Sequence, residues 1–135
     1  MTEAERHEMV KYRLERARKT FQEVDLHIEN GLWNTAINRI YYACFYALTS
    51  LLLKRGIAAK THAGVRQMFM LHFVKTKVVS TDQGKFFSEI FDMRLTGDYD
   101  DFIDYTEEDV LYVYPQAKEL LSVIERLAIN SEGDG

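Results

Sequence analysis

One arginine and the acidic residue after it are the side chains best suited to chemistry on a charged ligand. Arg94 closes a segment of helical periodicity, and Asp98 lies four positions further on. One interpretation is an ion pair at the helix end, where the helix dipole also favours a cation. The other is a contact to a phosphate or nucleotide, since a positioned guanidinium presents paired N–H donors. A positioned arginine can do both, so the sequence leaves both interpretations open.

An acidic and aromatic segment follows Arg94. We expect Tyr99 to be a half-buried ring that anchors this loop, and we expect the same of Phe102 and Tyr105. The carboxylates of the segment do not have the Asp-x-Asp-x-Asp-Gly spacing of a calcium loop. Glu107, Glu108 and Asp109 suit the first turn of a helix, where the helix dipole is positive. We therefore predict neither a metal site nor a cofactor from the run Asp98, Asp100, Asp101, Asp104, Glu107, Glu108 and Asp109.

Two further groups of polar side chains are candidates for ligand binding. Asn38 and Tyr42 lie four residues apart, and Arg39 lies beside them, within an otherwise apolar segment. Such polar side chains need partners, which are either neighbouring helices or a ligand. His62 follows Thr61, a suitable N-cap, so it begins a helix where a neutral imidazole can meet an anion. The alternative for His62 is an exposed residue of the first turn.

Helical periodicity runs through the whole chain and must position these residues. Apolar residues recur at steps of three and four, and we find no strand pattern and no internal repeat. The sequence predicts an all-α fold, an antiparallel four- to five-helix up-and-down bundle. We expect one domain over residues 1–130 and a frayed polar tail over residues 131–135. The predicted helices cover about residues 3–29, 32–54, 63–75, 82–95 and 107–130.

The expected helix ends follow from capping residues. Thr2 with Glu5, and Thr106 with Asp109, have the spacing of capping boxes. We expect Thr96-Gly97 to end the fourth helix, because glycine favours helix termination. Proline lacks the N–H of the helical hydrogen bond, so Pro115 should kink the fifth helix.

The composition indicates a soluble chain of one domain. Its 135 residues are 47% hydrophobic and 28% charged, and no apolar run approaches the ~20 residues of a membrane helix. The charged N-terminus is followed by no apolar segment of a signal peptide. Cys44 is the only cysteine, which excludes an internal disulfide and a cysteine-based metal cluster. We expect a cytoplasmic protein without membrane association.

Charge is distributed unevenly along the chain. Residues 1–77 hold 13 basic and 7 acidic residues, a net of +6, and residues 78–135 hold 4 basic and 14 acidic residues, a net of −10. Self-association of unlike halves, docking of a basic partner, and simple packing of unlike helices all fit this pattern. Packing is the favoured interpretation, because it sets the order of a bundle more often than surface charge does.

Three sequence blocks together resemble the small prokaryotic stand-alone branch of the HEPN family (higher eukaryotes and prokaryotes nucleotide-binding). They read "NRIYYACFYA" from Asn38, "KTHAG" from Lys60 and "RLTGDYDDF" from Arg94. The similarity covers about residues 16–127. It implies a helical bundle that dimerises, with the second helix and the third block lining the dimer cleft.

The resemblance also implies a function. Many HEPN relatives are metal-independent endoribonuclease toxins encoded beside a minimal nucleotidyltransferase antitoxin, and others bind RNA or nucleotides without catalysis. Active members carry an arginine followed after four to six residues by a histidine. Arg94 matches the arginine, and by the same resemblance Tyr99 stacks on a base or is a target of modification. The histidine window instead holds Tyr99, Asp100 and Asp101, and tyrosine is a poor base at neutral pH.

Three functions follow from these features. The first is a HEPN-type nucleotide- or RNA-interacting module, a homodimer and the partner of a minimal nucleotidyltransferase in a toxin–antitoxin-like system. The second is an active endoribonuclease with a divergent acid–base set, such as Tyr99 or His62. The third is a non-catalytic protein-interaction bundle. The site residues expected for the first two are Arg94 and Tyr99 in a catalytic role, and Asn38, Arg39, Tyr42, His62 and Asp98 in ligand binding.

Overall fold

A computed structural model describes residues 1–99 and 103–130 of the chain. The expected tail, together with Asp100, Asp101 and Phe102 of the acidic segment, lies outside these residues. The described residues form five α-helices and a short π-helical segment, η1, with no strand among them. These elements are α1 (Glu3–Glu29), α2 (Trp33–Lys54), α3 (His62–Phe69), η1 (Met70–Val74), α4 (Thr81–Tyr99) and α5 (Glu107–Ile129).

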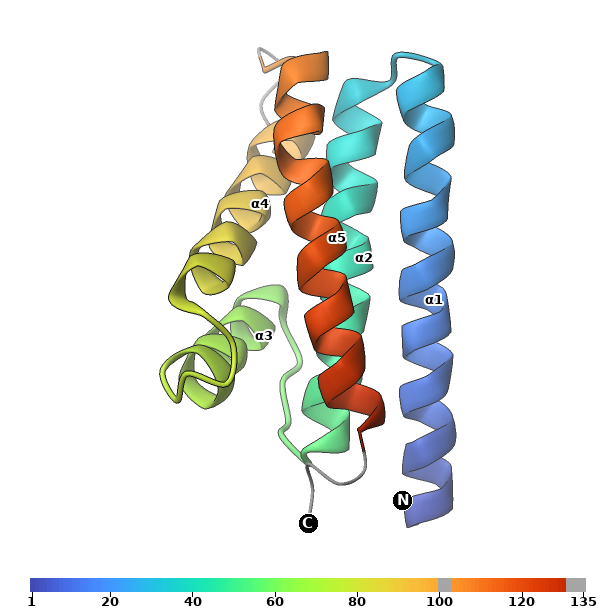
Figure 1. Ribbon diagram of the computed structural model, residues 1–135, viewed down its shortest axis with the longest axis vertical. Coiled ribbons are helices and arrows are strands. Elements are labelled where there is room, and N and C mark those ends of the chain that lie inside the picture. Colours follow the sequence, from blue (N-terminus) through green and yellow to red (C-terminus); the bar gives the residue numbers. More distant parts are fainter. Residues whose placement is uncertain (100–102, 131–135) are drawn as a thin grey trace.

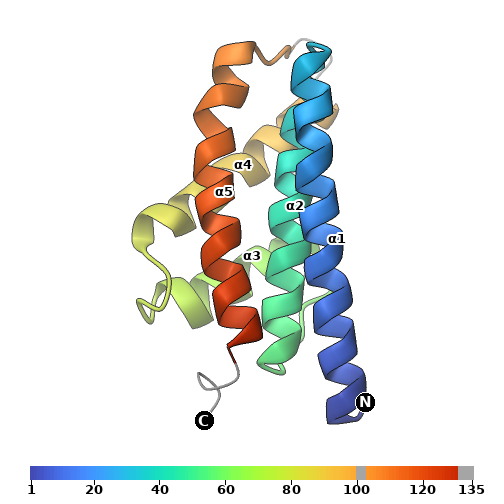
Figure 2. The same ribbon diagram turned by 45° about the vertical axis from the view of Figure 1, so that its right-hand side comes forward.

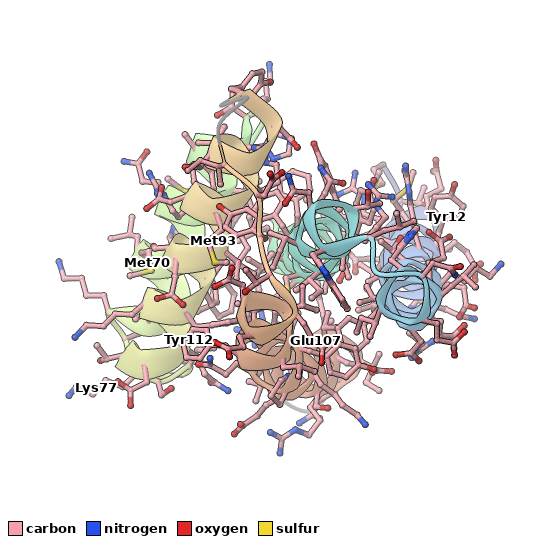
Figure 3. The ribbon with its side chains drawn as sticks, turned by 90° about the horizontal axis from the view of Figure 1, so that it is seen from above. Tyr12, Met70, Lys77, Met93, Glu107 and Tyr112 are labelled. Atoms are coloured by element: carbon pink, nitrogen blue, oxygen red, sulfur yellow. The ribbon has the colours of Figure 1, made fainter. Side chains whose placement is uncertain are left out.

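The four long helices alternate in direction, which confirms the all-α bundle (Figure 1). Helices α1, α2 and α5 lie side by side, while α4 crosses obliquely behind α5 and α2 (Figure 2). Seen from above, α2 lies between α1 on one side and the layer of α3 and α4 on the other (Figure 3). Helix α2 is therefore the central element of the bundle. No helix within residues 1–99 and 103–130 is long and apolar enough to cross a membrane.

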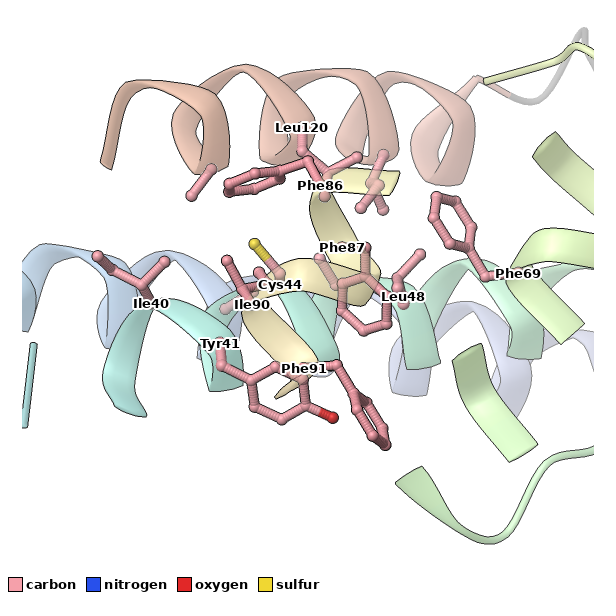
Figure 4. Close-up of a cluster of buried hydrophobic side chains, with 14 of the residues drawn as sticks. Ile40, Tyr41, Cys44, Leu48, Phe69, Phe86, Phe87, Ile90, Phe91 and Leu120 are labelled. Carbon is pink, nitrogen blue, oxygen red and sulfur yellow. The ribbon is translucent and has the colours of Figure 1, made fainter. Parts of the chain in front are cut away.

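The core forms around α2 because this helix is apolar over most of its surface. Tyr41 and Cys44 are fully buried there, and Phe87 of α4 and Leu120 of α5 pack against the same cluster. Figure 4 shows Tyr41 on the side of the cluster opposite Leu120, next to Phe91. The aromatic rings at this side of the core hold the candidate site described below.

The predicted caps are present. The Thr2 hydroxyl accepts from the Glu5 amide at 3.1 Å, and Glu5 accepts in turn from the Thr2 amide. The second capping box joins Thr106 and Asp109 in the same way. The Thr61 hydroxyl accepts from the Gly64 amide at 2.9 Å, which starts α3 at His62. Local sequence thus fixes where α1, α3 and α5 begin.

The expected end of the fourth helix was wrong. Helix α4 does not stop at Thr96-Gly97 but continues to Tyr99. The reason is close packing: a Cβ on Gly97 would lie 3.0 Å from the Tyr105 ring, so this glycine serves as a contact surface instead of a helix end. The third helix covers the expected residues but changes from α- to π-helical geometry at Met70. Pro115 lies inside α5, as expected, and the kink expected at this proline stays a prediction.

Candidate functional site

Arg94 is a buried cation held against aromatic rings. Its side chain is on the last turns of α4, and the residue is only 6% exposed. The guanidinium lies over the Tyr41 ring at 4.9 Å and over the Tyr42 ring at 5.7 Å from the ring centroids. Such cation–π contacts stabilise a partly desolvated charge. The two tyrosines therefore hold Arg94 in one place.

The polar contacts of the guanidinium include Asp98 and the Tyr41 hydroxyl. Its Nη1 lies 3.6 Å from Oδ2 of Asp98, which is longer than an ordinary charge-assisted hydrogen bond. Among the residues that the structure describes, no acceptor is within hydrogen-bonding reach of its Nε. Buried donors are nearly always paired. Arg94 is therefore a buried charge whose donors are only partly satisfied by the described residues.

A chain of polar contacts joins Arg94 to the exposed side of α2. The Asn38 amide nitrogen lies 3.3 and 3.4 Å from the two carboxylate oxygens of Asp98. Arg39 donates to the Asn38 amide oxygen from Nε and Nη2, and its guanidinium lies 5.1 Å from the Tyr42 centroid. Among the described residues, two guanidinium groups thus lie at the Tyr42 ring, and Asp98 contacts Arg94 and Asn38 beside them. The two cations attract anions.

His62 reaches the same cluster from the first turn of α3. Its Nδ1 and the Tyr41 hydroxyl share a hydrogen bond of 2.8 Å. The imidazole stacks on Phe45 at 4.1 Å between centroids and meets the Tyr42 ring edge-on. Burial, and then the nearby Arg94 charge, lower the pKa of His62 below its usual 6.5. The ring is therefore neutral at neutral pH.

The hydrogen bond to Tyr41 lets His62 present either a proton or a lone pair. Burial raises the pKa of the Tyr41 phenol, against the opposing charge of Arg94, so its proton stays on. When Tyr41 donates to Nδ1, the neutral imidazole carries its proton on Nε2. When Nδ1 instead donates to the phenolic oxygen, Nε2 has a free lone pair. The first state satisfies the Tyr41 hydroxyl, whereas in the second its O–H needs another acceptor. The first state is therefore favoured at rest, and Nε2 is the ring nitrogen that can exchange a proton with a ligand.

The family of the chain follows from its sequence as a whole. A profile of the HEPN domain matches residues 10–127 of the chain. The chain belongs to the HEPN family. The resemblance stated from three short sequence blocks is thereby confirmed over nearly the whole domain.

Similar proteins share both sequence and fold. A UPF0332 protein of Thermotoga maritima is 37% identical over 123 residues, 91% of this chain and 93% of that protein. A Methanocaldococcus jannaschii protein named "Putative toxin MJ0142" is 29% identical over 117 residues, 87% of this chain and 80% of its own length. The crystal structure of TT1696 from Thermus thermophilus matches with a TM-score of 0.75 at 19% identity and covers 87% of this chain and 97% of that one. This last likeness shows the shared fold.

The structure collects most of the residues predicted from the sequence in one place. We call this cluster the Arg94 site; it consists of Asn38, Arg39, Tyr41, Tyr42, His62, Arg94 and Asp98. HEPN enzymes place a histidine shortly after the arginine in sequence. Here the histidine at the arginine is His62, which is supplied by a different helix and joined to it through Tyr41.

Tyr99 does not anchor the acidic segment. Tyr99 is 78% exposed at the end of α4, so the expectation of a half-buried ring was wrong. Tyr105 has the anchoring role instead: its hydroxyl donates to the Met93 carbonyl at 2.7 Å, and its amide donates to the Asn34 side chain. These contacts leave the Tyr99 ring open to solvent beside the Arg94 site.

Tyr41 was not predicted from the sequence as a residue of the site. Its spacing placed it in the apolar stripe of α2, and it is indeed fully buried. Spacing along the chain does not reveal the direction of its hydroxyl, which points from α2 to His62 on α3. The hydroxyl was the signal that could have identified Tyr41, because a buried hydroxyl needs a polar partner. His62, in the next sequence block "KTHAG", is such a partner.

We expect His62 to make folding stability dependent on pH. Its pKa is lower in the folded chain than the ordinary 6.5 of the unfolded chain. Between these two values the unfolded chain binds more protons, so the full stability is present above 6.5 and declines as pH falls through this window. His62→Gln should flatten that decline. Urea unfolding of both proteins on either side of pH 6.5 measures it, and an equally steep decline in the variant would contradict the assignment.

Proposed function

We propose that this chain is a HEPN module of a toxin–antitoxin-like system, and that the Arg94 site binds a phosphate group of RNA or of a nucleotide. The observation that carries the proposal is the buried Arg94 guanidinium, whose Nε has no acceptor among the described residues. Arginine is well matched to phosphate because its planar fork donates two parallel hydrogen bonds.

The surroundings of Arg94 favour a nucleotide over a simple anion. Tyr42 adds an aromatic ring next to the two guanidinium groups, and the exposed Tyr99 directly follows Asp98 of the site in the sequence. Proteins that bind single-stranded nucleic acid combine cations for the backbone with aromatic rings for the bases. The names of two Methanocaldococcus jannaschii relatives, which propose that they are toxins, support the same context.

The chain acts as a homodimer and as the partner of a minimal nucleotidyltransferase. This part of the proposal rests on the HEPN family relation. It is tested by the mass of the purified protein in solution and by co-purification with a neighbouring nucleotidyltransferase. A chain that stays monomeric at micromolar concentration and binds neither single-stranded RNA nor AMP would contradict the proposal.

Asp98→Asn is expected to strengthen RNA binding by about two- to fivefold, because the Asp98 carboxylate lies next to Arg94 and repels an incoming phosphate. Fluorescence anisotropy with a labelled single-stranded RNA measures the change. Asp92→Asn is the matched control: Asp92 is on the same helix but is paired with Arg66. Unchanged or weaker binding by Asp98→Asn would argue against a phosphate at Arg94.

One observation favours a second candidate, a metal-independent endoribonuclease. Arg94 and His62 both contact Tyr41, so a phosphate-binding cation and a neutral imidazole share one site. In such an enzyme, His62 takes the proton of the ribose 2′-hydroxyl as its oxygen attacks the phosphorus, and Arg94 stabilises the charge on the phosphate. The P–O5′ bond breaks, which leaves a 2′,3′-cyclic phosphate, and the departing 5′-oxygen takes a proton from water. Incubation of purified protein with RNA in EDTA tests this function, and intact RNA in the presence of folded protein would exclude it.

A further inference from the structure

A groove lined mainly by α1, α2 and the connection to α3 contains none of the residues of the Arg94 site. Its lining residues come from α1, α2, the connection between α2 and α3, and the start of α3. Figure 1 shows this connection running back from the end of α2 toward α3. Its volume is about 570 Å³, which is within the range of binding sites for small molecules. Its lining residues with charged or aromatic side chains are Tyr12, Arg13, Arg16, Phe45, Tyr46 and Lys60.

The charge in this basic groove is of one sign. Arg13, Arg16 and Lys60 are its charged lining residues, and none of the residues that line it is acidic. Arg13 contributes one donor to the Thr49 carbonyl, and a guanidinium has five. A concave surface whose charged lining residues are all cations concentrates anions. The groove is thus complementary to a polyanion, although the chain as a whole is acidic.

Aromatic rings alternate with the cations. The Arg16 guanidinium lies 4.2 Å from the Tyr46 centroid, and Tyr12 is 63% exposed at the rim. Cations that follow a backbone, together with rings that stack on bases, are the features of single-stranded nucleic-acid binding. An acidic protein segment would use the cations but not the stacking surfaces, so these features favour a nucleic acid.

The basic groove continues into the Arg94 site through Phe45. This ring lines the groove, and its other neighbour is His62, on which it stacks at 4.1 Å. Tyr46, also in the groove, contacts Tyr42 of the Arg94 site at 5.8 Å between centroids. The two sites therefore share one aromatic surface along α2.

We propose that the basic groove binds the single-stranded RNA next to the nucleotide at Arg94, so that one RNA strand occupies both sites. The inference rests on the proposed function, because the strand is the same RNA. The basic groove is then a second RNA contact region, on α1 and α2, and it determines how much more tightly the chain binds a longer RNA than a short one.

The test compares two RNA probes. The dinucleotide UpU spans the Arg94 site alone, and an oligouridylate of about 10 nucleotides also reaches the groove. The groove variant is Arg13→Gln with Arg16→Gln. The control variant is Lys11→Gln with Lys85→Gln, which removes the same charge from exposed positions that do not line the groove. Chemical-shift titration measures UpU binding, and fluorescence anisotropy measures binding of the longer RNA.

We expect the groove variant to bind the longer RNA about tenfold more weakly than the control does, with a salt dependence reduced by about one phosphate contact. Its affinity for UpU should equal that of the control. Equal affinity of both variants for the longer RNA, an equal loss for both probes, or a changed mass in solution that marks the groove as a protein interface would each overturn the inference. Loss of UpU binding in Arg94→Gln tests the proposed function separately.

Discussion

Arg94→Gln is expected to weaken binding of single-stranded RNA by about 10- to 100-fold, the effect of losing one charge-assisted contact to a phosphate. Glutamine keeps a polar head of moderate length but removes the charge and the paired donors. The RNA affinity of Arg94→Lys should lie between those of the wild type and Arg94→Gln, because lysine keeps the charge but lacks the planar fork. Anisotropy titrations at constant salt measure all three proteins.

Two controls separate binding from folding in this experiment. Arg126→Gln removes an exposed charge from the last turn of α5, far along the chain from the Arg94 site. Its affinity should match that of the wild type. Because Arg94 also packs on Tyr41 and Tyr42, each variant is used below its own unfolding temperature. Wild-type affinity in a folded Arg94→Gln protein would contradict a phosphate contact at this residue.

The helices were largely predictable from the sequence because their signals are local. A threonine and an acidic residue three positions later start α1 and α5, and both capping boxes are present. The end of α4 was not predictable in this way. Gly97 looked like a helix stop, but the Tyr105 ring rests against its backbone. Whether a glycine ends a helix or admits a neighbour depends on tertiary packing, which spacing along the chain does not contain.

The candidate site shows the same division. Asn38 and Tyr42 share a face because they are four residues apart, and Arg94 and Asp98 are paired on α4 for the same reason. The approach of His62 to Tyr41 joins α3 to α2 and depends on how the helices pack. Spacing therefore identified the members on each helix, while their assembly into one site needed the fold.

The uneven charge of the sequence also has a partial explanation in packing. Arg18 of α1 pairs with Glu125 of α5, and Arg66 of α3 pairs with Asp92 of α4. These contacts join the basic and acidic halves within one bundle, as the packing interpretation expects. The cations of the basic groove are different, because their neighbours there are aromatic rings and the Thr49 carbonyl. This part of the basic half is available to an external anion.

If the chain cleaves RNA, His62→Ala is expected to slow cleavage by about 100- to 10,000-fold, the usual contribution of a general acid or base. The assay follows a labelled single-stranded RNA in EDTA. His72→Ala is the matched control, since His72 is an exposed residue of η1 that makes no contact with Tyr41 or Arg94 among those described. It should cleave like the wild type.

The pH profile distinguishes proton transfer from a structural role of His62. Tyr41→Phe removes the hydroxyl that pairs with Nδ1 but keeps the ring beneath Arg94. If His62 transfers the proton, this variant should move the pH at which cleavage becomes fast, because Nδ1 then loses the partner that balances its two tautomers. A purely structural His62 would lower the rate equally at every pH. An undiminished rate in folded His62→Ala would instead place the proton transfer at another residue, and Tyr99→Phe then tests the exposed tyrosine beside the site.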